Sequence, residues 1–321
     1  MQIIRHIDGQ DQNLAGSVVT LGNFDGIHLG HRALIHGAVT DSKKFNLPSV
    51  VLTFEPHPLK VLAPERAPKL ILAHKDKMQM LHNLGVDIVA VQHFDLSFAN
   101  LSAEEFVRDV LVRRLKTKKI WVGRDLRFGQ ARKGGVADLI RWGGNFGFDV
   151  AAVEPILIQG DRVSSSRIRE LLGAGRVDEV KAMLGRYHFV SGRVVKGHQR
   201  GKDLGFPTAN IAVRTEVLPA DGIYATRFQL GNLALLSVSS VGLNPTFGAG
   251  PRTVESFILD FDGSIYGEAV RLSFVKRLRE EVKFSSVTEL VAQIHADVES
   301  ARAIFRDLGI QPGTSSYLLN E

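Results

Sequence analysis

The sequence of 321 residues contains no cysteine, which excludes disulfide bonds and thiolate metal sites. It also lacks any apolar run approaching the roughly 18 residues that a membrane-spanning helix requires. The N-terminal stretch MQIIRHIDGQDQ has no apolar core of the kind found in signal peptides. Together these absences favour a cytoplasmic protein with no membrane partner.

The sequence has no long basic run either, although lysine and arginine outnumber the acidic residues and give a net charge of +6. The longest basic runs are pairs, such as Arg113-Arg114 and Lys118-Lys119. Nucleic-acid-binding domains usually gather their basic residues on one face or along one helix. The scattered charge therefore favours an enzyme that handles polyanionic small molecules and has no nucleic-acid partner.

Residues 18 to about 155 alternate between strand-like and helix-like patterns. Ser102 and Glu105 form a predicted capping box at the start of one helix. The alternation predicts a Rossmann-like α/β domain with a parallel sheet, whose ligands bind at the carboxyl ends of the strands. The predicted strands include 50–54, 86–92, 120–123 and 148–154, and the predicted helices cover 31–45, 75–84, 103–114 and 134–146.

After residue 187 the pattern changes to short β-rich runs separated by turns, which is typical of a β-barrel. A last helix is predicted over 287–305, with Ser286 and Glu289 as its capping box. Shorter helical patterns precede the change and end at Leu184. We therefore predict two closely joined domains, 1–185 and 186–321. The predicted barrel strands are 189–195, 209–213, 223–230, 233–239, 254–261 and 269–274.

The most informative segment is residues 18–34, VVTLGNFDGIHLGHRAL. An apolar strand is followed by a Gly-rich turn and a helix, so His28 and His31 stand at a helix N-terminus. Backbone N–H groups and the helix dipole favour anions there, and Gly30 allows a phosphate to approach closely. The segment resembles the H-x-G-H motif of nucleotidyltransferases, which bind ATP and transfer its adenylyl group. A plain strand–turn–helix with surface histidines is the alternative.

Three further segments of the first domain carry groups suited to nucleotides. TFEPHP at 53–58 ends a strand at the predicted ligand-binding edge, and GRDLRFGQARKG at 123–134 is a Gly-rich loop with several charges. SSSRIR at 164–169 places hydroxyls at a helix N-terminus, and its two arginines suit pyrophosphate. Each segment alone is also compatible with an ordinary strand end, a solvated loop or a serine cap.

In this order, the four segments resemble the FMN adenylyltransferase module of bacterial FAD synthetases, over residues 15–184. The resemblance implies that His28 and His31 stabilise the α-phosphate of ATP in the transition state. It implies phosphate- or ATP-binding roles for Gly22, Phe24, Asp25, Gly30, Ser164, Ser165, Ser166, Arg167 and Arg169. It implies FMN-binding roles for Phe54, Pro56, His57, Pro58, Asp125 and Phe128. The sequence departs from the family pattern at Ser166, Leu126 and Ala131, where threonine, phenylalanine and often glycine are usual.

The segment GHQRGKDLGFPTAN at 197–210 is the most informative part of the second domain. It is not a P-loop, because the spacing is one residue short and Asp203 replaces the serine or threonine. Thr208 and Asn210 are two apart in an extended segment, so their oxygen atoms face one point and can hold Mg²⁺. A turn and a strand with outward polar side chains is the alternative.

Glu255 lies in the run VESFILDF and shares its predicted face with Phe257 and Leu259. A carboxylate on an otherwise buried face indicates a positioned general base. An ion-paired residue at a strand edge is the alternative.

The order of these and neighbouring motifs resembles riboflavin kinase, over residues 186–305. The resemblance implies a small β-barrel with a C-terminal helix, in which Thr208 and Asn210 bind Mg²⁺ and ATP phosphate and Glu255 is the base. It implies ATP- or riboflavin-binding roles for Gly197, Gly201, Lys202, Gly205, Pro207 and Arg279. The sequence departs from the family pattern at Ser240, Asn244 and Ser264.

Both resemblances together predict a bifunctional enzyme. Its barrel would phosphorylate riboflavin with MgATP to FMN, and its first domain would join FMN to the adenylyl group of ATP, giving FAD and pyrophosphate. The expected partners are these small molecules, and the expected state is a monomer or weak homo-oligomer. Two alternatives remain: an enzyme with one active half, and a flavin-responsive nucleic-acid-binding protein.

Overall fold

The computed structural model describes residues 1–5, 14–197, 204–242 and 252–314. The chain divides into two compact units: Met1–Lys69 with His74–Ser164, and Leu70–Ala73 with Ser165–Glu321. The second unit thus begins earlier than residue 186. The two helices in between, α7 (Ser165–Gly173) and α8 (Val177–Leu184), belong to it because α8 packs on barrel strands β9 (His188–Val195) and β14 (Ala269–Arg279).

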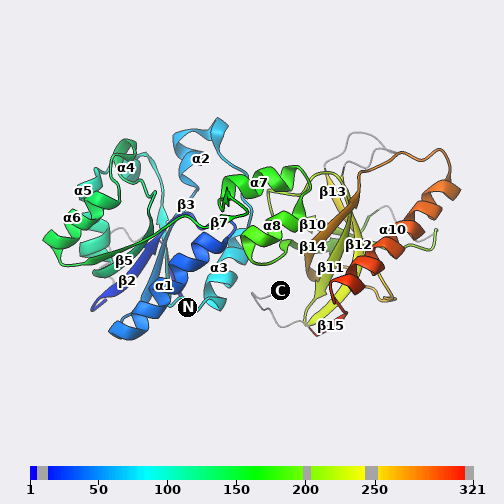
Figure 1. Cartoon of the computed structure of the whole chain (residues 1–321), viewed down its shortest axis with the longest axis horizontal. Coiled ribbons are helices and arrows are strands. Elements are labelled where there is room, and N and C mark those ends of the chain that lie inside the picture. The colour runs from blue at the N-terminus through cyan, green and yellow to red at the C-terminus, as the bar shows by residue number, and fades with distance from the viewer. Residues whose placement is uncertain (6–13, 198–203, 243–251, 315–321) are drawn as a thin grey trace. The chain divides into compact units, whose positions relative to one another are not determined.

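The first unit contains a sheet of six parallel strands in the order β1-β4-β3-β2-β5-β6 (Figure 1), which confirms the predicted Rossmann-like α/β fold. The order reverses between β2 and β5, and ligands of such sheets bind at the carboxyl ends of the strands beside that reversal. The residues that follow β2 therefore occupy the expected binding position. The strands are β1 (Gln2–Arg5), β2 (Ser17–Leu21), β3 (Ser49–Glu55), β4 (Ile88–His93), β5 (Thr117–Gly123) and β6 (Asp149–Val153).

Helices cover both faces of this sheet. Helix α1 (Leu29–Phe45) packs on β2, β3 and β5, while η2 (Phe106–Arg114) and α6 (Val136–Phe146) bury apolar side chains on the opposite face. The predicted helix over 103–114 is only partly right. Its capping box forms, with the Glu105 N–H 3.2 Å from Ser102 Oγ, but after α5 (Ala103–Glu105) the hydrogen bonds widen to the π-helical pattern of η2.

Several short elements of the first unit were not predicted. They are the edge strand β1, helix α2 (Pro58–Leu62), η1 (Pro64–Arg66), α4 (Leu96–Ala99), η3 (Gln130–Arg132) and the hairpin of β7 (Leu157–Ile158) and β8 (Asp161–Arg162). The remaining long helix, α3 (His74–Asn83), agrees with the prediction. Short elements escape sequence patterns because they span too few residues to show a period.

The second unit is an antiparallel barrel of six strands in the order β11-β14-β9-β10-β13-β12, closed by pairing of β12 with β11, as predicted (Figure 1). The predicted terminal helix is α10 (Val287–Asp307), and β15 (Gly313–Thr314) adds to the edge of β12. The other strands are β10 (Thr208–Val213), β11 (Gly222–Leu230), β12 (Leu233–Gly242) and β13 (Thr253–Ile258).

The barrel interior combines aromatic rings with a chain of buried hydroxyl groups. Thr226 Oγ1 lies 2.7 Å from both Ser237 Oγ and Ser239 Oγ, and Ser239 donates to Ser256 Oγ at 2.9 Å. All four residues are fully buried. Because every hydroxyl has a partner, the polar atoms cost little to bury, and the cross-strand bonds favour this strand register.

Two details of the second unit correct the sequence-based expectations. On β13 the side chains of Val254, Ser256 and Ile258 point inward. Glu255 therefore lies on the outer, half-buried face of the strand together with Phe257, whereas Leu259 follows the end of β13 and is not part of that face. At α10, Ser286 Oγ accepts the Glu289 N–H at 3.2 Å, but the Glu289 carboxylate accepts from the preceding serine instead of closing the box.

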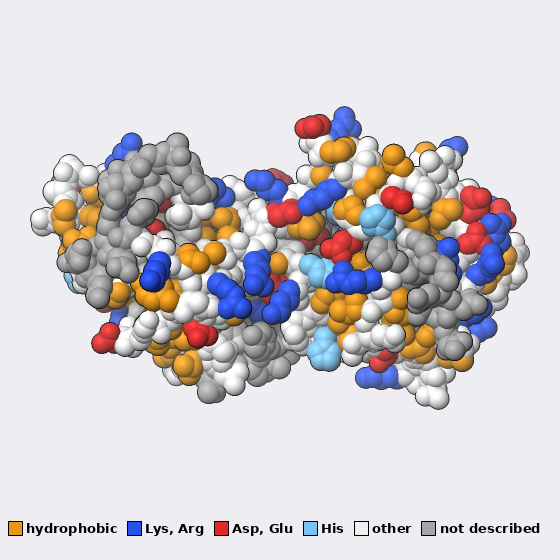
Figure 2. All heavy atoms as spheres, turned by 180° about the vertical axis from the view of Figure 1, so that it is seen from behind, with side chains coloured by type: hydrophobic (Ala, Val, Ile, Leu, Met, Phe, Trp, Pro, Cys, Tyr) orange, Lys and Arg blue, Asp and Glu red, His pale blue; other side chains and the backbone are white. Residues whose placement is uncertain are grey.

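The surface agrees with the scattered charge of the sequence. In Figure 2, lysine and arginine side chains occur at several separate places on the face shown, with acidic and apolar side chains between them. Within the described ranges, every helix falls short of the length and apolarity that crossing a bilayer would require.

Candidate active sites

The turn after β2 is held in an unusual conformation. Phe24 and Ile27 both have left-handed backbones, with φ of 49° and 41°, and both side chains are fully buried. A left-handed β-branched residue costs of order 1–3 kcal/mol, and such strain persists only where surrounding packing enforces it. The buried Phe24 and Ile27 side chains provide that packing, so they fix the direction in which the chain enters α1.

His28 caps α1 and stacks on His31. His28 Nδ1 accepts the His31 N–H at 3.3 Å, and the two rings lie 3.6 Å apart at 17°. His28 therefore precedes the first residue of α1, and the two histidines lie together at the helix N-terminus, as predicted. A Cβ at Gly30 would approach the His28 ring at 3.1 Å, so a glycine here leaves room for the ring.

His31 is suited to bind a ligand as a neutral ring. Burial lowers the pKa of His31 well below its usual value, and His28 and Lys77 lower it further. Since His28 Nδ1 accepts a bond, the proton of a neutral His28 ring is on Nε2. His31 Nδ1 is buried and has no hydrogen-bond partner among the described residues. A polar ligand at the helix entry would supply one.

Lys77, on α3, reaches this turn and was not predicted. Its Nζ donates to the backbone oxygen of Asn23 at 2.9 Å and to Thr53 Oγ1 at 2.8 Å. Burial lowers the pKa of Lys77 to about 8, while the carboxylates of Asp25 and Glu55 act in the opposite direction. The helix 75–84 carried no motif, so only the three-dimensional structure reveals this contact.

The TFEPHP segment lies beside the same turn. The Asn23 side-chain amide is 3.1 Å from His57 Nε2, and His57 Nδ1 accepts the Leu59 N–H at 3.2 Å as the cap of α2. Pro58 is the first residue of α2, and the bond before Pro56 is cis. The His57 side chain is thus brought to the turn that leads into His28.

The other predicted FMN-binding residues have additional structural contacts. Phe54 packs against Phe94 at 5.8 Å between ring centroids, and Phe128 is 7% exposed in the same core, against Phe106 at 5.5 Å. Asp125 is exposed and forms an ion pair with Arg162. A flavin role for Phe128 and Asp125 stays a prediction, and the buried ring of Phe128 clearly anchors its loop.

The serine–arginine segment begins a helix, as predicted. Ser164 is the last residue of the first unit, and α7 starts at Ser165 in the second. Ser166 is exposed, Arg169 is half-buried, and Arg167 Nη1 lies 2.6 Å from Glu170 Oε1. The segment therefore crosses the division between the units, and its role in binding phosphate stays a prediction.

In the barrel, strand register gathers three of the predicted residues on one face. Asn210 on β10 is directly opposite Glu255 on β13, and Thr208 Oγ1 donates to Glu255 Oε2 at 3.2 Å. Gly197 lies against Asn210: a Cβ there would come within 2.2 Å of its amide nitrogen. Gly201, Lys202 and Asn244 lie outside the described residues. The site thus contains a hydroxyl, an amide and a carboxylate within reach of one another.

The remaining described kinase residues have structural features of their own. Gly205 has a left-handed φ of 85°, and Pro207 is exposed just before β10. Arg279 makes a bidentate ion pair with the buried Asp297 of α10, with Nε–Oδ1 and Nη2–Oδ2 distances of 2.8 Å. In this structure Arg279 therefore ties the end of β14 to the terminal helix, and a contact with substrate stays a prediction.

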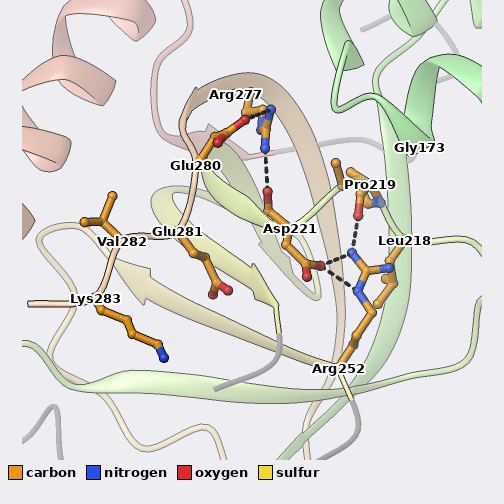
Figure 3. Close-up of a pocket in the computed structure, with 11 residues that line it drawn as sticks. Gly173, Leu218, Pro219, Asp221, Arg252, Arg277, Glu280, Glu281, Val282 and Lys283 are labelled. Carbon is orange, nitrogen blue, oxygen red and sulfur yellow. Dashed lines mark hydrogen bonds and ion pairs between the residues drawn. The ribbon is translucent and has the colours of Figure 1, made fainter. Parts of the chain in front are cut away.

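A pocket of about 710 Å³ adjoins the carboxylate site and was not predicted (Figure 3). Its wall includes Glu281, whose carboxylate accepts from Ser240 Oγ at 3.1 Å, and Ser240 is directly opposite Glu255 in the sheet. Burial raises the pKa of Glu281. Arg252 spans another part of the wall, donating to Asp221 Oδ1 at 2.7 Å and to the Pro219 backbone oxygen at 2.5 Å.

Comparisons with known proteins agree with this division into two sites. The family model described as FAD synthetase matches residues 10–167, and the model described as riboflavin kinase matches residues 184–305. The first covers the histidine turn, and the second covers the carboxylate site of the barrel. The two matches describe a chain with an adenylyltransferase-type unit followed by a kinase-type unit.

Whole-chain relatives show the same arrangement. The chain is 38% identical over 307 residues to the bifunctional riboflavin kinase/FMN adenylyltransferase of Escherichia coli K12, covering 95% of this chain and 98% of that protein. It is 36% identical over 294 residues to the protein of that name from Listeria monocytogenes, covering 91% and 93%. The chain belongs to the family of bifunctional riboflavin kinase/FMN adenylyltransferases.

A solved structure shares the fold over nearly the whole length. It is a Streptococcus pneumoniae protein described as a macrolide-efflux protein, 33% identical, with a TM-score of 0.84 over 94% of this chain and 99% of that one. That description applies to the Streptococcus protein; the similarity shows that both units occur together in it.

Proposed function

We propose that this chain makes FAD in two reactions, phosphorylating riboflavin in the barrel and adenylylating FMN in the first unit. One observation carries the proposal. Each unit holds a separate cluster of predicted catalytic groups, and each cluster lies within the residues matched by the corresponding family model. The first cluster follows the central strand of a parallel sheet, where nucleotides bind in such folds.

In the first unit, a phosphate oxygen of FMN attacks the α-phosphorus of ATP. The new P–O bond replaces the bond to the β-phosphate oxygen, and pyrophosphate leaves with its electron pair. The nucleophile is already anionic, so no general base is required, and catalysis consists of positioning and charge stabilisation. The His28 and His31 rings and the N–H groups opening α1 donate to the phosphate oxygens.

In the barrel, Glu255 is proposed to accept the proton of the riboflavin 5′-hydroxyl as that oxygen attacks the γ-phosphorus of ATP. Phosphoryl transfer otherwise depends on positioning and on offsetting phosphate charge. Thr208, Asn210 and Glu255 offer three oxygen donors on one sheet face, which fits the preference of Mg²⁺ for hard oxygen ligands. A bound Mg²⁺ would offset the charge of the ATP phosphates there.

The adjoining pocket is proposed to receive riboflavin. Three carboxylates line it, those of Asp221, Glu280 and Glu281, together with three basic side chains, those of Arg252, Arg277 and Lys283. A neutral polyhydroxy chain would find both acceptors and donors there. The link through Ser240 places the pocket beside Glu255. A hydroxyl at the end of that chain could therefore reach the proposed base.

The test is a time course with riboflavin, ATP and Mg²⁺, resolving FMN and FAD. FMN should rise first and FAD should follow, and a chelator of divalent cations should stop FMN formation. FMN without FAD, even when FMN is supplied, would show that only the barrel is active. The monomeric or weakly oligomeric state and the cytoplasmic location stay predictions.

A further inference from the structure

We propose that Lys77 is a positioning residue for adenylyl transfer: it joins the turn that carries the histidines to the end of β3 and holds a positive charge beside them. This inference rests on the proposed adenylyltransferase function of the first unit. Lys77 comes from α3, outside every segment that the motifs cover. Its role therefore follows from contacts and not from sequence pattern.

The contacts form a closed triangle with fixed donor directions. An ammonium group only donates, so Thr53 Oγ1 must accept from Lys77 at 2.8 Å. Thr53 then uses its own proton to donate to the Asn23 backbone oxygen at 3.3 Å, and Lys77 donates to the same oxygen at 2.9 Å. Asn23 thus has its carbonyl held from two sides, directly before the left-handed Phe24.

The triangle connects the turn that carries the histidines to the strand end that is proposed to bind FMN. Asn23 belongs to the turn that leads into His28, and its side chain contacts His57 of the segment after β3. Lys77 therefore fixes the turn relative to the proposed FMN-binding strand end. Groups that orient a reacting shell in this way typically change activity about 10–100-fold when removed.

The charge of Lys77 also suits the chemistry. Both of its bonds go to uncharged oxygens, so its positive charge can act on negative charge that develops at the helix entry. The ionisable groups around it are Asp25 on the turn, Glu55 after β3, with His74 Nδ1 3.3 Å from its carboxylate, and the His28–His31 stack on α1. Among them, His31 loses its proton at acid pH, far from the titration of Lys77.

The experiment compares Lys77→Met and Lys77→Arg with Lys75→Met, a matched change at an exposed lysine of the same helix. FMN adenylylation is measured from pH 6 to 9.5 as kcat and KM for ATP, alongside riboflavin phosphorylation and thermal unfolding. Lys77→Met should lower kcat about 10–100-fold, with riboflavin phosphorylation unchanged. Lys75→Met should match the parent.

The pH profile separates a positioned charge from a structural contact. The pKa of Lys77 is about 8, so the parent should lose adenylylation activity as pH rises through that value. Lys77→Arg keeps its charge throughout, so its activity should stay level there and remain within about tenfold of the parent at neutral pH. If the adenylylation activity of Lys77→Arg falls with rising pH as that of the parent does, the inference is overturned.

A further variant covers the case in which Lys77→Met does not fold. Thr53→Val keeps Lys77 but removes its acceptor, and should lower kcat in the same direction with Thr53→Ser as its control. Parental rates in Thr53→Val, or in a folded Lys77→Met, overturn the inference. A parent that makes no FAD from FMN and ATP overturns the proposed function itself, before any variant is compared.

Discussion

The two sites of this molecule are built in different ways. In the barrel, Thr208, Asn210 and Glu255 meet because neighbouring strands place them in register on one face. In the first unit, His28 and His31 follow a turn with left-handed residues. The Asn23 carbonyl of that turn accepts from Lys77, which lies 46 residues beyond His31 in the sequence. Strand alternation is visible in a sequence, whereas a strained turn held by a distant side chain is not.

The sites also bury opposite kinds of charge. Burial lowers the pKa values of His31 and Lys77 in the first unit, while it raises the pKa of Glu281 in the second. In both units burial shifts the proton equilibrium toward the neutral form, although Lys77, with a pKa of about 8, still carries its charge at neutral pH. The two reactions should therefore respond to pH through different groups, and variants can separate them within one protein.

Among the variants, Glu255→Gln should give the largest difference between the kinase and adenylyltransferase activities. Glutamine keeps the size of the side chain but cannot accept the proton of the attacking hydroxyl, so FMN formation should fall about 10²–10⁴-fold. Adenylylation of supplied FMN should be unaffected. Rates of both reactions and the melting temperature check this. Loss of both activities with early melting would make Glu255 a structural residue and remove the contrast between the sites.

The mirror-image change is His28→Ala. It removes a donor at the helix entry and the acceptor for the His31 N–H, so FAD formation from FMN should fall about 10²–10³-fold. Riboflavin phosphorylation should stay at the parental rate. A folded variant with full FMN-to-FAD turnover would contradict the role assigned to the histidine pair.

Acid should weaken the barrel through His188. Burial, with a smaller effect of Arg186, lowers the pKa of His188 from 6.5 to about 3. In the unfolded chain His188 binds a proton below pH 6.5, whereas in the folded barrel it binds one only below about pH 3. Between these values this residue should therefore reduce the free energy of unfolding by about 1.4 kcal/mol for each unit that pH falls. Above pH 6.5 it should have no such effect.

Intrinsic spectra can follow each unit separately. Both tryptophans, Trp121 and Trp142, are in the first unit, and all four tyrosines lie beyond residue 186. Denaturant unfolding is monitored by tyrosine absorbance at several pH values. The free energy of unfolding should fall with pH in the parent and fall less steeply in His188→Gln. Equal pH slopes in the two proteins would argue against a buried neutral histidine.

The smallest effect is expected for Glu281→Gln. One acceptor in the pocket loses its charge while the carbonyl oxygen facing Ser240 is kept, so KM for riboflavin should rise about fivefold, the equivalent of one hydrogen bond. KM for ATP should change less. A rise confined to ATP would mean that the pocket takes the nucleotide.

The elements with long, regular patterns were predictable from the sequence. The parallel sheet, the barrel and α10 follow from apolar periodicity, and the Ser102–Glu105 box from local capping chemistry. The π-helical η2 was not, because the cap and the apolar residues indicate a helix but do not show whether its backbone hydrogen bonds span four or five residues.

The parts of the sites that escaped prediction depend on tertiary contacts. Lys77 and Glu281 approach their sites from segments without a motif, and the left-handed Ile27 is enforced by burial. One departure from the family pattern does gain a physical meaning. Ala131, where the family often has glycine, has a φ of 52°, a conformation that glycine adopts without strain.

The four residues Leu70–Ala73 bear on any attempt to separate the two activities. They belong to the second unit, where the Leu70 N–H donates to Glu216 Oε2 at 2.7 Å, the Val217 N–H donates to the Leu70 oxygen at 3.3 Å, and Ile71 and Leu72 are buried. No single cut in the chain yields both units whole. A gene fragment beginning at residue 165 would encode a kinase without these residues, and a short peptide spanning them is the natural complement to restore it.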